Sequence, residues 1–189
     1  VGGGHRCLSS MDNFGGSVRK RTVRVVLILV GVGRGADHEA MSVTRSTHPP
    51  MFVDHSDTGL VLAGIRRYNL FTTVFFLGRH RRLIDELVRT SGARPGDDAV
   101  DIGCGPGKLV RALGARVGPR GSAVGIDPSA EAVAYNSRRD HRPNHRYVRS
   151  SAQELPFPDN SFDVVTCTFV MHHIPESRRE AALAEMWRG

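Results

Sequence analysis

Residues 99–113 read AVDIGCGPGKLVRAL, an apolar run followed by a glycine-rich loop and by apolar residues at helical spacing. We expect a short strand, a tight turn and a helix. Glycine carries no Cβ, so such a turn lets the backbone approach a ligand closely. The N–H groups at the start of the following helix favour an anionic or polar group. The glycines of a loop of this kind can also serve only the turn itself.

The spacing around the loop separates two kinds of nucleotide site. The dinucleotide fingerprint is G-x-G-x-x-G, whereas this loop reads G-x-G-x-G with Lys108 in the place of the third glycine. A second apolar run, residues 122–126, ends at Asp127, twenty residues after Gly107. An acidic residue at that place binds ribose hydroxyls in nucleotide-binding folds. Capping of the next helix is the alternative role for Asp127.

The rest of the C-terminal half repeats the alternation of strand and helix. The run at residues 164–170 is β-rich and almost wholly apolar, as in a strand buried on both faces. Alternation of this kind predicts an α/β fold with a doubly wound parallel sheet. The expected strands lie at residues 99–102, 122–126, 145–149 and 162–168, and the later helices at residues 130–139 and 177–187.

Several motifs in this order resemble those of class I S-adenosylmethionine-dependent methyltransferases. Residues 100–107 (VDIGCGPG) look like the first motif of that family, and residues 125–129 (GIDPS) look like the second. The resemblance covers residues 60–187 and implies a Rossmann-like fold. It also implies the cofactor S-adenosyl-L-methionine and methyl transfer to a small, lipophilic acceptor. Further segments are similar to the branch that methylates quinones, sterols and other small molecules: AQELPF (152–157), DNSFDVV (159–165) and HHIP (172–175).

The resemblance implies specific roles for the glycine loop. Gly103, Gly105 and Gly107 match the loop that passes under the methionine part of the cofactor. Cys104 lies within this loop, and Asp101 is expected to organise it. The backbone around Gly103 is expected to meet the amino group of the methionine part.

Two further segments match the nucleoside part of the cofactor. Asp127, followed by Pro128, matches the acid that holds both ribose hydroxyls, because a carboxylate can accept two O–H donors at once. Ser151, Ala152 and Gln153 match the stretch beside the adenine. The family usually has aspartate in place of Ser151, and a neutral hydroxyl makes a weaker hydrogen bond than a carboxylate.

No catalytic side chain is assigned from the sequence. Thr168 and Phe169 match the wall near the reactive sulfonium, and methyl transfer from a sulfonium needs no protein nucleophile. His172 and His173 are interpreted as a pocket edge, with a role as catalytic base as the alternative. A nucleophilic role for Cys104 is a further alternative.

The sequence predicts an incomplete sheet. Members of the family continue beyond a segment like residues 184–188 into a turn and three more strands. Four strands in the order 3-2-1-4 leave the fourth with an open apolar edge, which invites aggregation. We therefore expect a fragment, a decayed copy, or a chain completed by a partner or by self-association at that edge. A non-catalytic fragment that binds S-adenosylmethionine or S-adenosylhomocysteine is the alternative to an enzyme.

The chain divides into three regions. Residues 1–50 mix glycines with basic runs, and we expect a disordered or non-native extension, with Met41 as a candidate start. The basic run before Val25–Val32 has the outline of a signal peptide but lacks a clear cleavage site. Residues 51–97 are expected to form a helical segment that covers the sheet or the acceptor site. Residues 98–189 are expected to form the cofactor-binding domain.

Helical spacing within the middle region extends over residues 59–91, with a break at Gly78. Its aromatic part, Tyr68–Phe76, is a candidate lid for the acceptor pocket. A helix that simply covers one face of the sheet is the alternative interpretation.

Composition narrows the classes of function. The net charge is +7, but residues 98–189 carry 12 basic and 11 acidic residues, so no nucleic-acid partner is expected. The three cysteines form no CxxC pair, and no metal-ligand spacing is present. No apolar stretch is long enough to span a membrane, and a cytoplasmic protein is expected. A nicotinamide-dependent oxidoreductase and a nucleic-acid binder are the remaining alternatives.

Overall fold

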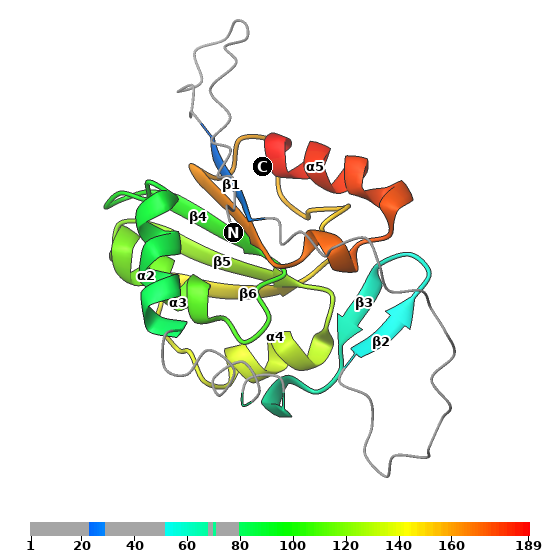
Figure 1. Cartoon of the computed structure of the whole chain (residues 1–189). Coiled ribbons are helices and arrows are strands. Elements are labelled where there is room, and N and C mark those ends of the chain that lie inside the picture. The colour runs from blue at the N-terminus through cyan, green and yellow to red at the C-terminus, as the bar shows by residue number, and fades with distance from the viewer. Residues whose placement is uncertain (1–22, 29–51, 68–69, 71–79) are drawn as a thin grey trace, which may run out of the picture.

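The computed structural model describes residues 23–28, 52–67, 70 and 80–189. Its centre is a five-stranded sheet in the order β1-β7-β4-β5-β6 (Figure 1). Every neighbouring pair in this sheet is parallel. The strands are β1 (Arg24–Ile28), β4 (Asp98–Ile102), β5 (Ser122–Asp127), β6 (His145–Arg149) and β7 (Val164–Thr168).

Helices and a hairpin surround this sheet. A two-stranded antiparallel hairpin lies beside α4, close to the carboxyl ends of the strands (Figure 1). Two short 3-10 turns, η1 (Met171–His173) and η2 (Glu176–Arg178), follow β7. The hairpin strands are β2 (Phe52–His55) and β3 (Gly59–Leu62), and the helices are α2 (His80–Thr90), α3 (Lys108–Val117), α4 (Ala130–Ser137) and α5 (Arg179–Arg188).

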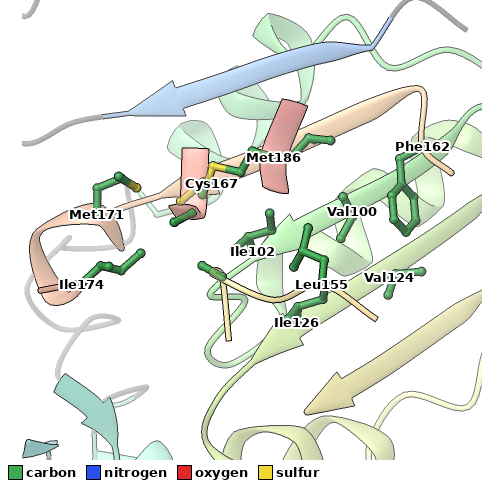
Figure 2. Packing of buried hydrophobic residues seen from close by; sticks show 13 residues of the cluster. Val100, Ile102, Val124, Ile126, Leu155, Phe162, Cys167, Met171, Ile174 and Met186 are labelled. Carbon is green, nitrogen blue, oxygen red and sulfur yellow. The ribbon is translucent and has the colours of Figure 1, made fainter. Parts of the chain in front are cut away.

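Alternation along the strands builds two apolar layers. Ala99 of β4 packs with Leu87 of α2 and Leu113 of α3. Its neighbour Val100 faces the other way and packs in the cluster that contains Met186 of α5. Figure 2 shows this second cluster, which side chains of β4, β5 and β7 share with α5. Successive side chains of a strand point to opposite faces, so both faces of the sheet are covered.

The predicted topology is confirmed for the four strands drawn from the sequence. The order 3-2-1-4 appears as β6-β5-β4-β7. The strand expected at residues 145–149 has those bounds, and the one expected at 162–168 begins at Val164. The expected helices at 130–139 and 177–187 are present as α4 and α5, with ends shifted by one or two residues.

The expectation of a sheet of only four strands is wrong. Arg24–Ile28, within the region expected to be an extension, forms β1 and pairs with all five residues of β7. The edge expected to be open is therefore occupied by the chain's own N-terminal segment. The remainder of residues 1–50 lies outside the described part of the chain.

Apolar packing and one ion pair hold β1 in place. Val25 and Leu27 are half-buried and pack against the cluster on the α5 side. The Arg24 N–H donates to the carbonyl oxygen of Asp163 at 3.0 Å, and its guanidinium pairs with Asp97. These partners lie far away in the sequence, so the local pattern around residue 24 did not reveal the strand.

The middle region differs from its predicted helix. Residues 59–62 form β3 of the hairpin, whereas His80–Thr90 form α2 as expected. The candidate lid Tyr68–Phe76 lies outside the described residues, apart from Leu70. The hairpin is fixed because the Ser129 hydroxyl donates to the carbonyl oxygen of Leu62. Tertiary contact with α4 thus decides the conformation of a segment whose spacing is compatible with a helix.

None of the helices in the described part of the chain is long and apolar enough to cross a membrane. The described residues also contain no group of three or more histidine, cysteine, aspartate or glutamate side chains that could hold a metal ion.

A charged side chain at Val25 tests whether β1 belongs to the fold. We expect Val25→Asp to lower the free energy of unfolding by about 1–3 kcal/mol, because it places a carboxylate against the apolar cluster. Val53→Asp is the matched control, because Val53 of β2 is 39% exposed. Urea unfolding measures both. Equal and small effects at the two positions would place Arg24–Ile28 outside the fold.

Candidate functional site

A pocket opens at the carboxyl ends of the central strands. Its walls come from the glycine loop after β4, the end of β5, the segment after β6, the segment after β7, and the β2–β3 hairpin. Ligands bind in this position in open α/β sheets.

The glycine loop is tied to β5. The N–H groups of Gly103 and Cys104 both donate to the carbonyl oxygen of Ile126, at 2.7 and 2.9 Å. The N–H of Gly105 donates to Oδ2 of Asp127 at 2.8 Å. Gly105 has a φ of 46°, and a Cβ added there would meet no protein atom within 4 Å. A side chain at Gly105 would therefore enter the space of the pocket.

A buried asparagine supports the loop from behind. Asn136 of α4 is fully buried, and its Nδ2 donates to the carbonyl oxygen of Gly105 at 2.7 Å. A Cβ at Gly107 would lie 2.6 Å from Oδ1 of Asn136. Gly107 is thus needed for the close approach of the loop to α4. Sequence reasoning missed Asn136, because no motif marks it and only packing brings it to the loop.

Asp127 is the buried acidic side chain that faces the pocket. Its Oδ2 accepts from Gly105, and its Oδ1 accepts from the N–H of Ser129 at 2.9 Å. An ionised carboxylate offers about four acceptor positions, so these two bonds leave about two for a ligand. Burial raises the pKa of Asp127, while the bonds from Ser129 and Gly105 oppose that rise.

The capping role considered for Asp127 is wrong. Ser129 is the N-cap of α4, and its hydroxyl oxygen accepts from the N–H of Ala132 at 3.2 Å. The carboxylate of Asp127 is therefore not the cap of that helix. Its position beside Gly105 and at the pocket wall is consistent with a ligand-binding role.

Asp101 lies behind the loop rather than in the pocket wall. Its Oδ1 accepts from the Thr166 hydroxyl of β7 at 2.8 Å. Burial raises the pKa of Asp101 to about 7, the Thr166 bond opposes the rise, and the charge of Asp127 adds to it. The side chain of Asp101 is thus hydrogen-bonded to β7, whereas the N–H groups of the loop donate their hydrogen bonds to β5.

The segment after β6 forms another wall. Ser151, Ala152 and Gln153 all line the pocket, together with Pro128 beside Asp127. Nε2 of Gln153 donates to the carbonyl oxygen of Asp57 at 3.4 Å, which links this wall to the turn of the hairpin.

The hairpin supplies a wall that sequence reasoning missed. Phe52, Leu60 and Leu62 line the pocket from β2 and β3. Val170 and Ile174, from the segment after β7, provide further apolar lining. The predicted helix over residues 59–91 concealed this contribution, since a helix and a short strand are hard to separate by periodicity alone.

Some predicted site residues support the pocket without lining it. Cys104 and Gly107 are buried, and burial is the main cause that raises the pKa of the Cys104 thiol well above its usual range. A raised pKa disfavours the thiolate, so the structure gives no support to a nucleophilic Cys104. Thr168 and Phe169 end the β7 segment, and the next residue, Val170, reaches the pocket. Phe169 has a φ of 60°, which is uncommon for a residue with a side chain.

The raised pKa of Asp101 predicts a pH dependence of stability. Between its usual pKa of 3.8 and about 7, the folded chain binds a proton at Asp101 that the unfolded chain does not. The stability contributed by Asp101 therefore falls as pH rises through this window. Asp101→Asn keeps an acceptor for Thr166 and cannot ionise, so we expect its stability to fall less between pH 5 and pH 8. Urea unfolding at four pH values measures this, and parallel curves for the two proteins would contradict it.

The chain is similar to known methyltransferases. A family model described as "Methyltransferase domain" matches residues 99–189. The ubiquinone/menaquinone biosynthesis C-methyltransferase of Stenotrophomonas maltophilia is 36% identical over 129 residues, 65% of this chain and 49% of that protein. The demethylmenaquinone methyltransferase of Staphylococcus aureus is 33% identical over 124 residues, 65% of this chain and 51% of that protein. The chain thus spans about half the length of the curated relatives it matches.

Solved structures show the same fold. A SAM-dependent methyltransferase from Aquifex aeolicus is 26% identical with a TM-score of 0.51, over 56% of each chain. A Methanococcus maripaludis protein, 19% identical with a TM-score of 0.54, covers 66% of this chain and 57% of its own length and supports the fold alone. Together with the glycine loop and the strand order, these findings identify residues 99–189 as a methyltransferase domain similar to those of class I S-adenosylmethionine-dependent methyltransferases.

Proposed function

We propose that this chain binds S-adenosylmethionine in the pocket and transfers its methyl group to a small, lipophilic acceptor. The observation that carries the proposal is the placement of Asp127. Its carboxylate is buried at the pocket wall, spends two acceptor positions on the loop and on α4, and keeps about two for a ligand. Two adjacent ribose hydroxyls match this remaining capacity.

The rest of the cofactor is assigned to the neighbouring walls. The adenine lies beside Ala152 and Gln153, and the Ser151 hydroxyl offers a neutral acceptor to its amino group. The methionine part lies over Gly103 and Gly105, with room for it at Gly105. The open space above Gly105 supports this assignment.

The bound cofactor supplies an electrophilic methyl group on a sulfonium. The protein's task is then to hold the acceptor in line with that methyl group and to exclude water. Leu60, Leu62, Val170 and Ile174 suit the second task, because they give one part of the pocket an apolar lining. The same lining favours an apolar acceptor over a charged one.

The names of the relatives indicate a chemical class for the methyl acceptor. Two of them are named for C-methylation in ubiquinone and menaquinone synthesis and for methylation of demethylmenaquinone. We infer that the acceptor of this chain is an aromatic molecule of the quinone type. The apolar hairpin wall supports this inference, since a fused ring buries well against leucine and phenylalanine.

A pair of ligands that differ only in the ribose hydroxyls tests the role of Asp127. We expect the wild-type chain to bind adenosine about 10- to 150-fold more tightly than 2′,3′-dideoxyadenosine, because the carboxylate accepts charge-assisted hydrogen bonds. Asp127→Ala should remove this preference, and Asp127→Asn should recover part of it. Calorimetry measures each affinity. Each variant is its own control, because any loss of loop order affects both ligands, and an unchanged preference in Asp127→Ala would reject the assignment.

A side chain in the open space above the loop tests the path of the cofactor. We expect Gly105→Val to weaken S-adenosylhomocysteine binding at least about tenfold, because the side chain occupies the pocket. Gly118→Val is the matched control: Gly118 also has a positive φ and open space, but it ends α3 away from the pocket. Binding within about twofold of wild type in Gly105→Val would exclude this path.

Activity is measured separately from binding. Transfer of a labelled methyl group from S-adenosylmethionine to reduced naphthoquinone would establish turnover by this chain. S-adenosylhomocysteine binding without transfer to a panel of quinols, sterols and phenols would instead favour the non-catalytic binding fragment.

A further inference from the structure

The glycine loop between β4 and α3 has a backbone that many conformations suit. Gly103, Gly105 and Gly107 all have positive φ, at 70°, 46° and 67°. Glycine reaches more backbone conformations than other residues, so a loop of this composition loses much entropy when a ligand orders it. A protein group that fixes the loop beforehand removes part of that cost from binding.

Different elements hold the two sides of the loop's backbone. The N–H groups of residues 103–105 donate to the end of β5. The carbonyl oxygens of Gly105 and Pro106 accept instead from side chains of the two helices that follow, α4 and α3. The carbonyl side therefore depends on two side chains, Asn136 and Arg111.

Arg111 joins these carbonyl contacts into one network. Its Nη2 donates to the carbonyl oxygen of Pro106 at 3.0 Å. Its Nη1 donates to Oδ1 of Asn136 over a longer distance, 3.5 Å, and Nδ2 of Asn136 donates to the carbonyl oxygen of Gly105 at 2.7 Å. A guanidinium only donates and a backbone carbonyl only accepts, so both neighbours require the same orientation of the Asn136 amide. Arg111 thus acts on Pro106 directly and on Gly105 through Asn136.

Arg111 lies behind the loop. It is half-buried in the first turn of α3, where its N–H donates to the carbonyl oxygen of Gly107 at 3.1 Å. Gly103 and Gly105 line the pocket, whereas Arg111 is not among the described residues of the lining. An effect of Arg111 on ligand binding therefore has to pass through the loop.

We propose that Arg111 is a positioning residue that, with Asn136, holds the glycine loop in the conformation that binds the methionine part of S-adenosylmethionine. The nucleoside part is assigned to Asp127 and residues 151–153, and the N–H bonds from the loop to β5 do not involve Arg111. Loss of Arg111 then weakens binding of the methionine part and spares the nucleoside part. This inference rests on the proposed function of the pocket.

Substitutions within α3 separate the network from the charge and from the helix. Arg111→Met removes the guanidinium but keeps an unbranched side chain with good helix propensity. Arg111→Lys keeps the charge, but its single ammonium group lacks the planar fork that reaches Pro106 and Asn136 together. Arg116→Met is the matched control, because Nε of Arg116 donates to the carbonyl oxygen of Ala93 from the last turn of the same helix.

The probes are S-adenosylhomocysteine and 5′-methylthioadenosine, which has the same nucleoside and a thioether but no amino-acid group. Calorimetry measures both affinities, and thermal unfolding checks that each variant is folded. We expect Arg111→Met to bind S-adenosylhomocysteine about tenfold more weakly, the order expected for one lost charge-assisted hydrogen bond. Its affinity for 5′-methylthioadenosine should stay within about twofold of wild type. Arg111→Lys should show a smaller loss of the same kind, and Arg116→Met should match wild type for both ligands.

The outcomes separate this inference from the proposed function. Failure of the wild-type chain to bind S-adenosylhomocysteine would reject both. If the wild-type chain binds it, an Arg111→Met variant with unchanged affinity would reject the role of Arg111 alone. Equal losses for the two ligands would also overturn that role, by showing that Arg111 supports the whole pocket. If Arg111→Met does not fold, the same comparison in Arg111→Lys decides, and an unchanged or an equal affinity loss would again reject the role.

Discussion

The pocket depends on the hydrogen bonds that Asp127 accepts from the backbone. One carboxylate oxygen takes the N–H of Gly105, and the other takes the N–H of Ser129. These bonds join the glycine loop, the end of β5 and the start of α4 at a single buried charge. The desolvation of that charge is unfavourable, which is why its pKa is raised. The two backbone bonds offset part of this cost and leave the remaining acceptor positions facing the pocket.

The sheet around this site is completed by contacts between distant parts of the chain. Asn136 reaches the loop from α4, and β1 reaches β7 from near the N-terminus. Neither contact follows from a local pattern, because the partners are separated by many residues. Covering the β7 edge also matters physically, since an exposed apolar strand edge pairs readily with other chains.

The hairpin gives the pocket an apolar wall in addition to its polar one. The loop and Asp127 form a polar wall suited to a nucleoside, whereas Phe52, Leu60 and Leu62 form an apolar wall. His173 lies where the hairpin meets the end of β7, and its ring stacks on Phe52. A pocket divided in this way suits two ligands of different polarity, as the proposed methyl transfer to a lipophilic acceptor requires.

The sequence by itself determined the strand–loop–helix unit and the order of four strands, and it predicted the glycine loop, Asp127 and residues 151–153 as parts of the site. These features rest on local spacing: glycines within five residues, an acid at a strand end, and apolar runs of strand length. Only the tertiary structure decided that Arg24–Ile28 pairs with β7, that residues 59–62 form a strand, and that Ser129 rather than Asp127 caps α4. It also revealed Asn136 behind the loop. The physical reason is that these depend on side chains meeting across the fold, where packing and hydrogen-bond partners override local propensity.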